Sequence, residues 1–393
     1  METPARPESI GQKRSRSGDQ RFQRYVKSSQ QEKDVCEDWY HVQDGFRYVI
    51  PYVFAFRVNC KRRWIGRSVL DTFSREFHYK PEKYWREEIS SGRLLCRDER
   101  VEPGYILDGS EWMTHWIHRH ESAVLDAEID KVYEDDSLLV VSKPPSIPVH
   151  PCGSYRRNAL TYLTALKLGL TGLRTVHRLD KHTSGLVIFA KTKEVATRLC
   201  KQIEERKVAK TYVALVSGDF PRSLTSCEDK LSFDVREQIA RVDPHGKDTE
   251  TRFEVVAYSS DHDVSLVRCF PKTGRTHQIR VHLKALGYPI CNDPVYCEKL
   301  KSIGSEEAND SAKLQLPSLD ESMSEAILAE GRTLECKTCP AVTAKEKVHD
   351  PTIIYLHAEE YAGEGWRYKS KLPSWAAAVH EATNGSSRES ASE

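Results

Sequence analysis

The chain has 393 residues, of which 39% are hydrophobic and 30% are charged. This length suits two structured units with tails, and the hydrophobic fraction is enough for a real core. The 59 basic and 58 acidic residues nearly cancel, so overall charge does not indicate a nucleic-acid-binding protein, and any such role must come from local clusters.

The N-terminus is polar and no long apolar run occurs, so we expect neither a signal peptide nor a membrane partner. The cysteines lack regular spacing, which fits buried free thiols in a reducing compartment. We therefore expect a cytoplasmic protein. The basic run at 13–16 leaves the nucleus as an alternative. Mitochondrial import also stays open, although Glu2, Glu8 and Asp19 depart from the acid-poor composition of presequences.

Residues 1–44 are polar and lack apolar periodicity, which predicts a disordered tail. The tail is basic, because residues 1–30 carry seven basic and three acidic side chains. Aromatic and β-branched residues then dominate from Gly45 to Val58 and predict a strand.

Residues 45–120 are expected to form a small domain. Within it, 66–78 and 81–90 predict two short helices, with Ser68 as a cap and Pro81 in the first turn. A turn and a strand at 94–96 follow. The cations of this region include Lys61, Arg62, Arg63, Arg67, Arg75, Lys80, Lys83, Arg86 and Arg93. This pattern resembles the S-four-like RNA-binding domain; a solvated basic face is the alternative interpretation.

A second unit is expected over 121–370. Its predicted elements are strands at 138–141, 210–216, 252–270 and 353–358, and helices at 192–206 and 276–286. Strands and helices do not alternate regularly, which favours an α+β fold with a mixed or antiparallel sheet and flanking helices. An acidic segment at about 300–335 predicts an exposed insertion, since residues 304–330 hold seven acidic residues and one lysine. Residues 371–393 are expected to be a disordered tail.

One short string places a carboxylate among cations: residues 176–185 read Val-His-Arg-Leu-Asp-Lys-His-Thr-Ser-Gly and lead into an apolar strand. Nearby cations keep Asp180 ionised, so it is a candidate nucleophile or general base. A buried carboxylate needs a partner, and Arg280 is the candidate. The alternative is a structural ion pair without chemistry.

A second basic string lies at 273–282. In the predicted helix, His277 and Arg280 are one turn apart and lie on the same side. Arg275 precedes them, next to Gly274. This basic face is suited both to neutralise Asp180 and to hold a phosphate.

Four ordered blocks carry a resemblance to a known family. They are Lys143-Pro144 with 148–151, the string around Asp180, Lys210-Thr211-Tyr212, and 274–282. Together they resemble the RluA family of RNA pseudouridine synthases, especially the eukaryotic branch that includes transfer-RNA uridine-32 enzymes. Pro145-Ser146 departs from the Ala-Gly of many members. The resemblance implies the pseudouridine synthase catalytic fold, preceded by the S-four-like domain.

The resemblance also implies an activity, the isomerisation of uridine to pseudouridine in RNA without cofactor or metal. Asp180 would be the catalytic carboxylate, attacking the ribose or abstracting a proton from it, and Arg280 would pair with it. Tyr212 would stack on the uracil and act in proton transfer. Arg178 would fill the space of the flipped-out nucleotide. The remaining expected RNA contacts are His177, Lys210, Arg275 and His277.

The expected partner is RNA. Transfer RNA is favoured, ribosomal and messenger RNA are alternatives, and a monomer is the default. The cluster at 172–210, with ten basic and four acidic residues, supports RNA contact independently. A solvated helix face is the alternative reading of Lys201, Arg206 and Lys207.

The sequence also offers two other functions. One is an RNA-binding protein without catalysis, which the intact Asp180, Tyr212 and Arg280 disfavour. The other is a zinc nucleobase deaminase, suggested by Cys336-x-x-Cys339 with His357-Ala-Glu359. In that enzyme class the His-x-Glu precedes the cysteines, the reverse of the order here. No metal site is therefore expected, and His357 is assigned to the end of a core strand.

Overall fold

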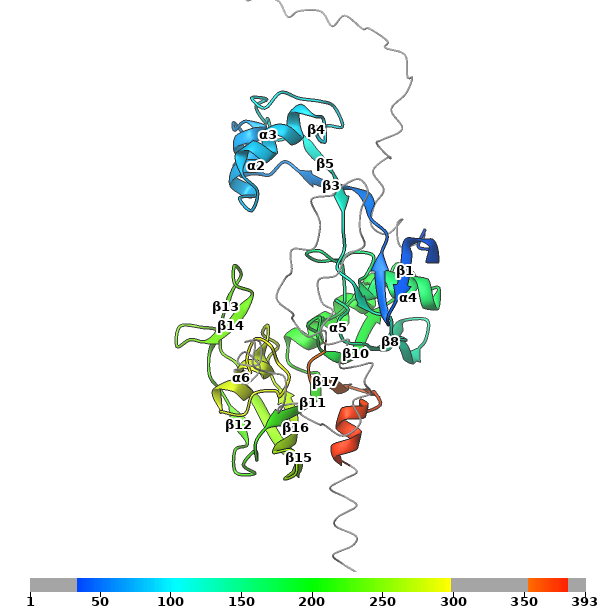
Figure 1. Ribbon diagram of the computed structural model, residues 1–393, viewed down its shortest axis with the longest axis vertical. Helices are drawn as coiled ribbons and strands as arrows, with labels where there is room; N and C mark the ends of the chain where they lie inside the picture. The colour runs from blue at the N-terminus through cyan, green and yellow to red at the C-terminus, as the bar shows by residue number, and fades with distance from the viewer. Residues whose placement is uncertain (1–33, 298–352, 381–393) are drawn as a thin grey trace, which may run out of the picture. The chain divides into compact units, whose positions relative to one another are not determined.

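The computed structural model describes residues 34–297 and 353–380. These residues divide into two compact units (Figure 1). One unit is residues 53–118, and the other combines residues 34–52 with 119–297 and 353–380. Residues 1–33, the acidic segment with Cys336 and Cys339, and residues 381–393 lie outside the described residues.

In the first unit, two helices pack beside a three-stranded sheet. The helices are α2 (Val69–Glu76) and α3 (Glu82–Ser90), and the strands run in the order β3 (Tyr52–Asn59), β5 (Trp112–Arg119) and β4 (Leu94–Cys96). Ser68 caps α2 through a hydrogen bond from the Asp71 amide, as the sequence predicts. Both predicted helices are confirmed, with Pro81 at the N-cap of α3 instead of inside its first turn.

The N-terminal described segment belongs to the second unit. It contains η1 (Glu37–Trp39), β1 (Tyr40–Gln43) and β2 (Phe46–Val49), and β2 pairs with β6 (Val124–Leu125). Buried Glu121 accepts hydrogen bonds from the Tyr52 hydroxyl and from the amides of residues 156–158. These contacts join residues 40–52 to the second unit, whereas the sequence pattern divides them between a tail and the small domain.

The second unit is built on a ten-stranded sheet. Its order is β12-β15-β16-β11-β17-β10-β8-β7, with β18 paired to β17 and β9 paired to β10. The strands are β7 (Asp130–Glu134), β8 (Leu138–Lys143), β9 (Arg174–Thr175), β10 (Ser184–Ala190), β11 (Ala209–Ser217), β12 (Ser226–Cys227), β15 (Thr251–Ser259), β16 (Val264–Pro271), β17 (Leu356–Gly363) and β18 (Trp366–Lys369). Within this sheet β10 and β17 pair in parallel and the other pairs are antiparallel. The predicted mixed sheet is confirmed.

Strand β17 comes last among the eight strands of this order, yet it lies at the centre of the sheet. It joins β7, β8 and β10 on one side to β11, β16, β15 and β12 on the other (Figure 1). At the junction, Gly185 has a φ of +109°, and a side chain there would overlap the carbonyl oxygen of Ala358. Glycine is therefore required where the two halves meet.

Three helices and a hairpin accompany the sheet: α4 (Leu160–Leu168), α5 (Lys193–Glu204), α6 (Gln278–Ala285), and β13 (Leu231–Asp234) with β14 (Ile239–Val242). Helices α5 and α6 confirm the predictions, although α6 begins two residues later than expected. Strand β17 begins at Leu356 instead of 353, and residues 374–380 of the expected C-terminal tail are helical. The pattern predicted neither α4 nor the hairpin.

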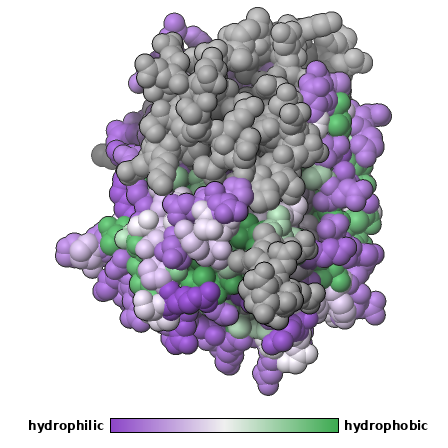
Figure 2. Space-filling model, turned by 60° about the horizontal axis from the view of Figure 1, so that its bottom comes forward, coloured by the Kyte–Doolittle hydropathy of each residue, from purple (hydrophilic) through white to green (hydrophobic). Residues whose placement is uncertain are grey.

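Where Figure 2 colours the surface by hydropathy, hydrophilic residues predominate and hydrophobic ones form small groups. Among the described helices, none combines the length and apolar character needed to span a bilayer.

Candidate active site

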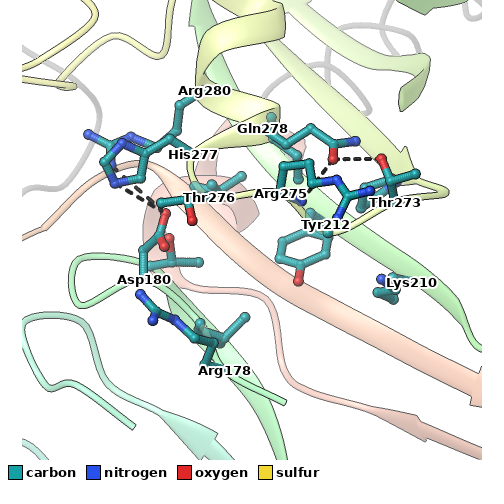
Figure 3. Close-up of a pocket in the computed structure, with 16 residues that line it drawn as sticks. Arg178, Asp180, Lys210, Tyr212, Thr273, Arg275, Thr276, His277, Gln278 and Arg280 are labelled. Atoms are coloured by element: carbon teal, nitrogen blue, oxygen red, sulfur yellow. Dashed lines mark hydrogen bonds and ion pairs between the residues drawn. The ribbon is translucent and has the colours of Figure 1, made fainter. Parts of the chain in front are cut away.

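The residues singled out in the sequence meet in one pocket of about 170 Å³. Its walls are the loop before β10, the start of β11 and the turn that leads into α6 (Figure 3). Seven of the eight predicted site residues line it: Arg178, Asp180, Lys210, Tyr212, Arg275, His277 and Arg280. Segments that lie far apart in sequence, from Arg178 to Leu356, therefore form a single site.

Asp180 is the carboxylate of this pocket, and its side chain is 21% exposed. One of its oxygens, Oδ2, lies 3.8 Å from Nε2 of His277 and 3.9 Å from Nη1 of Arg280. The Thr183 amide donates to the Asp180 carbonyl, which closes a turn around the residue. The carboxylate thus faces two nitrogen-bearing side chains while remaining open to the pocket.

A buried lysine supports the backbone of the loop that carries Asp180. Lys143 ends β8 and donates hydrogen bonds to the carbonyls of Pro144 (2.8 Å) and Lys181 (3.1 Å). Burial lowers the pKa of Lys143 to about 7, and the charge of Asp180 acts in the opposite direction. The Lys143-Pro144 block therefore fixes the backbone next to Asp180.

Arg280 is almost fully buried, and its nearest partner differs from the predicted one. Its Nε and Nη2 donate to the two oxygens of Asp293 at 2.6 and 2.8 Å, in a bidentate pair. Burial opposes the charge, but the hydrogen bonds and charge of Asp293 raise the pKa of Arg280 above its usual value. The predicted partner, Asp180, receives only Nη1 at 3.9 Å. Asp293 is thus the partner of Arg280 in the structure, and the sequence motifs did not indicate it.

His277 does not lie on the helix as predicted but is the N-cap of α6, with a φ of +59°. Its Nδ1 lies 2.9 Å from the hydroxyl of Tyr296. Burial, and then the charge of Arg280, lower the pKa of His277 to about 4. At neutral pH the imidazole is therefore uncharged, and it contacts Asp180 as a dipole.

Tyr212 lies where β11 and β17 shift register, between Thr211 and Tyr212. Its hydroxyl is 2.6 Å from that of buried Tyr361. Burial raises the pKa of Tyr212 to about 12, although the hydrogen bond with Tyr361 lowers it. The phenol therefore stays protonated at neutral pH and presents an aromatic ring to the pocket.

His177 is the predicted site residue that does not line the pocket. Its Nε2 accepts a hydrogen bond from the Ile188 amide, and its ring packs edge-on against Tyr361. Burial, and then the charge of Lys210, lower its pKa to about 3. The structure therefore places a neutral, packed imidazole where an RNA contact was expected.

The rim of the pocket is basic. Arg178 and Arg275 are exposed, and Lys210 is half-buried, with a pKa lowered by that burial. Gln278 holds the turn that carries Arg275, because its Oε1 accepts from the Thr273 hydroxyl and the Arg275 amide (Figure 3). The arrangement combines one carboxylate, one neutral phenol and a cationic rim, which suits carboxylate chemistry on a polyanion.

The structure does not test the zinc alternative, because Cys336 and Cys339 lie outside the described residues; within the described part of the chain, no group of three or more potential metal ligands occurs. His357 lies in β17, near its start and not at its end as expected, and its two ring nitrogens contact the hydroxyls of Ser184 and Ser370.

Comparisons with known proteins identify a family model and several relatives that match this chain. Residues 137–285 match the family model described as RNA pseudouridylate synthase. The chain is 37% identical over 363 residues to RNA pseudouridine synthase 7 of Oryza sativa, covering 86% of this chain and 92% of the relative. Two proteins of Saccharomyces cerevisiae are also similar. The mitochondrial tRNA pseudouridine(32) synthase is 33% identical, covering 90% of this chain and 83% of the relative. The tRNA pseudouridine(31) synthase is 34% identical, covering 86% and 96%.

These relatives match nearly the whole chain, and the family model spans the Asp180 loop, β11 and α6 together. The chain therefore belongs to the RluA-type family of RNA pseudouridine synthases, isomerases that convert uridine in RNA to pseudouridine.

Proposed function

We propose that Asp180 is the catalytic carboxylate of this enzyme and that its substrate is a uridine of transfer RNA. The observation that supports the role of Asp180 is its geometry. It is the carboxylate that lines the pocket, and it lies within 4 Å of both His277 and Arg280. Arg280 is itself fixed by Asp293, so Asp180 meets a rigid cation and keeps its other face open.

The reaction needs no external reactant. The glycosidic bond from N1 to the ribose breaks, the uracil turns, and a bond from C5 to the ribose forms; the proton leaves C5 and N1 gains one. Asp180 acts on the ribose, as nucleophile or as base. The ring of Tyr212 stacks on the uracil, and its protonated hydroxyl serves the proton transfers. Exposed Arg178 takes the place of the extruded nucleotide.

The names of two relatives support transfer RNA as substrate, since they specify positions 31 and 32 of tRNA. The cationic rim formed by Arg178, Lys210 and Arg275 is suited to the phosphates around such a uridine. We infer that this enzyme modifies one of these two adjacent positions.

Release of tritium from C5 tests both parts of this proposal. Transcripts of one tRNA with [5-³H]uridine, carrying uridine at 31, at 32 or at neither position, are incubated with wild type, Asp180→Asn and Asp219→Asn. Wild type and the exposed control Asp219→Asn should release tritium, whereas Asp180→Asn should bind the RNA and release none. Release at the wild-type rate by Asp180→Asn would remove Asp180 from the chemistry. Equal release from all three transcripts would exclude positions 31 and 32.

The first unit is proposed to be the S-four-like RNA-binding domain. It presents exposed cations, including Lys61 and Arg62 before α2 and Lys83 on α3. Replacing Lys61 and Arg62 by alanine should weaken RNA binding and lower its salt dependence by about two counterions. Arg100→Ala is the control, because Arg100 is an exposed cation of the same unit that does not belong to the predicted RNA-binding pattern. An unchanged salt dependence in the double variant would indicate a merely solvated face.

We also propose a monomer that acts in the cytoplasm. Sedimentation with and without tRNA tests the first point, and a dimer at working concentration would contradict it. Cell fractionation tests the second point, with the mitochondrion as the competing outcome because one yeast relative is named as mitochondrial.

A further inference from the structure

Tyr296, which follows α6, contacts His277, Arg280 and the strand β14. Its hydroxyl lies 2.9 Å from Nδ1 of His277, and the same hydroxyl exchanges hydrogen bonds with the backbone of Ala240 in β14. Its ring lies under Arg280, whose guanidinium carbon is 4.9 Å from the ring centroid. Tyr296 is itself held in place, because its amide donates to Asp293.

The Tyr296 hydroxyl has a single hydrogen to donate, and this limits the hydrogen bonds that it can make. The Ala240 amide donates to the Tyr296 oxygen at 2.9 Å. The hydroxyl has one proton, which goes either to Nδ1 of His277 at 2.9 Å or to the Ala240 carbonyl at 3.2 Å. The shorter contact is to His277.

This choice decides which nitrogen of His277 carries the proton. If Tyr296 donates to Nδ1, then Nε2 bears the hydrogen and directs an N–H dipole at Asp180, 3.8 Å away. If Tyr296 donates to Ala240, then Nδ1 bears the hydrogen and the lone pair of Nε2 faces the carboxylate. The first arrangement is attractive toward an ionised carboxylate and the second is repulsive.

We propose that Tyr296 is a positioning residue that holds His277 as the Nε2–H tautomer, so that Asp180 faces a neutral donor as well as Arg280. The proposal rests on Asp180 being the catalytic carboxylate. Because the donor is neutral, it orients and stabilises the carboxylate without competing with it for a proton. The hairpin takes part, since Ala240 fixes the hydroxyl and Phe233 packs edge-on against the imidazole.

The surroundings of His277 favour this neutral form. Its charged neighbours are Asp180, Arg280 and Asp293, and His182 also acts on it. Desolvation and Arg280 outweigh the two carboxylates, which agrees with a pKa of about 4. A neutral imidazole has two tautomers, so a partner is required to select one.

Selective ¹⁵N labelling of histidine reads the tautomer directly in the full-length protein. The resonances of His277 are assigned by their loss in His277→Gln. Wild type should show a protonated Nε2 and an unprotonated Nδ1. Tyr296→Phe keeps the ring beneath Arg280 and removes the hydroxyl, so its His277 should show a mixture of both tautomers. A wild-type proton on Nδ1, or an unchanged tautomer in Tyr296→Phe, would overturn the proposal.

Kinetics provide the second readout. Tyr296→Phe should lower kcat by about tenfold, the rate equivalent of losing one hydrogen bond beside the reacting carboxylate, with KM unchanged. The control Tyr258→Phe also loses a hydroxyl hydrogen bond, to Asp263, and should keep the wild-type kcat. An unchanged kcat in Tyr296→Phe would refute the positioning role. Activity in Asp180→Asn would instead refute the catalytic role of Asp180, and the ¹⁵N spectra would still report the tautomer.

Discussion

Replacing Asp293 by asparagine should destabilise this enzyme far more than replacing Asp180, although both carboxylates approach the same guanidinium. Asp293 is fully buried and accepts two short hydrogen bonds from Arg280, which is 2% exposed. Asparagine keeps the size and removes the charge, so Arg280 is left in the interior with Asp180 at 3.9 Å as its nearest described carboxylate. Removing one partner of such a buried pair costs about 3–5 kcal/mol of unfolding free energy.

Asp180, in contrast, is partly exposed and farther from Arg280, so Asp180→Asn should cost less than about 1 kcal/mol. With about 2–4 °C of Tm per kcal/mol for a domain of this size, the Asp293 variant should melt about 6–20 °C below wild type. The double variant leaves the guanidinium without either carboxylate, so its loss should exceed the sum of the two single losses. Urea denaturation of wild type, the two single variants and the double variant measures these losses of unfolding free energy. A loss below about 1 kcal/mol for Asp293→Asn would show that the pair does not carry the buried charge.

Three further outcomes are expected. Buried histidines with lowered pKa values bind fewer protons folded than unfolded, so unfolding free energy should fall as pH drops below about 6.5, by up to about 1.4 kcal/mol per pH unit for each such histidine. Urea titrations from pH 7 to 5 check this, and a flat profile would contradict neutral imidazoles at His177, His277 and His357. Arg178→Ala should weaken RNA binding and reduce the slope of log affinity against log salt by about one, as binding at several salt concentrations would show. Gly185→Ala should abolish a cooperative thermal transition, because its side chain would overlap the facing strand; a wild-type Tm would disprove the close approach.

The helices that the sequence predicts are those whose sequence shows an apolar face. Helix α5 buries Leu199 and exposes its other side, and its period is visible in the sequence. Helix α4 buries all of residues 160–165, so it shows no polar face from which a helix could be recognised. The hairpin was missed because its turn at 235–238 contains neither glycine nor proline.

The sequence predicted most residues of the site but not which carboxylate pairs with Arg280. Motifs located Asp180 and Arg280, but two carboxylates compete for that arginine, and proximity in space decides between them. Asp293 stands directly before a proline, a turn signal that could have drawn attention to it. The contact between Tyr296 and His277 depends on how the turn after α6 packs, and no local pattern encodes that.

The central place of β17 has a consequence for biosynthesis. Asp180 stands before β10, on one side of β17, whereas Tyr212 and the residues that lead into α6 belong to the other side. A ribosome delivers both half-sheets well before it delivers residues 356–363. Until β17 has been made, β10 and β11 each have an edge that lacks its partner strand. Unpaired edges of this kind promote aggregation and need protection by chaperones. A nascent chain that stops short of β17 is thus an exposed intermediate without a closed active site, and the site can close only after residues 356–363 have been made.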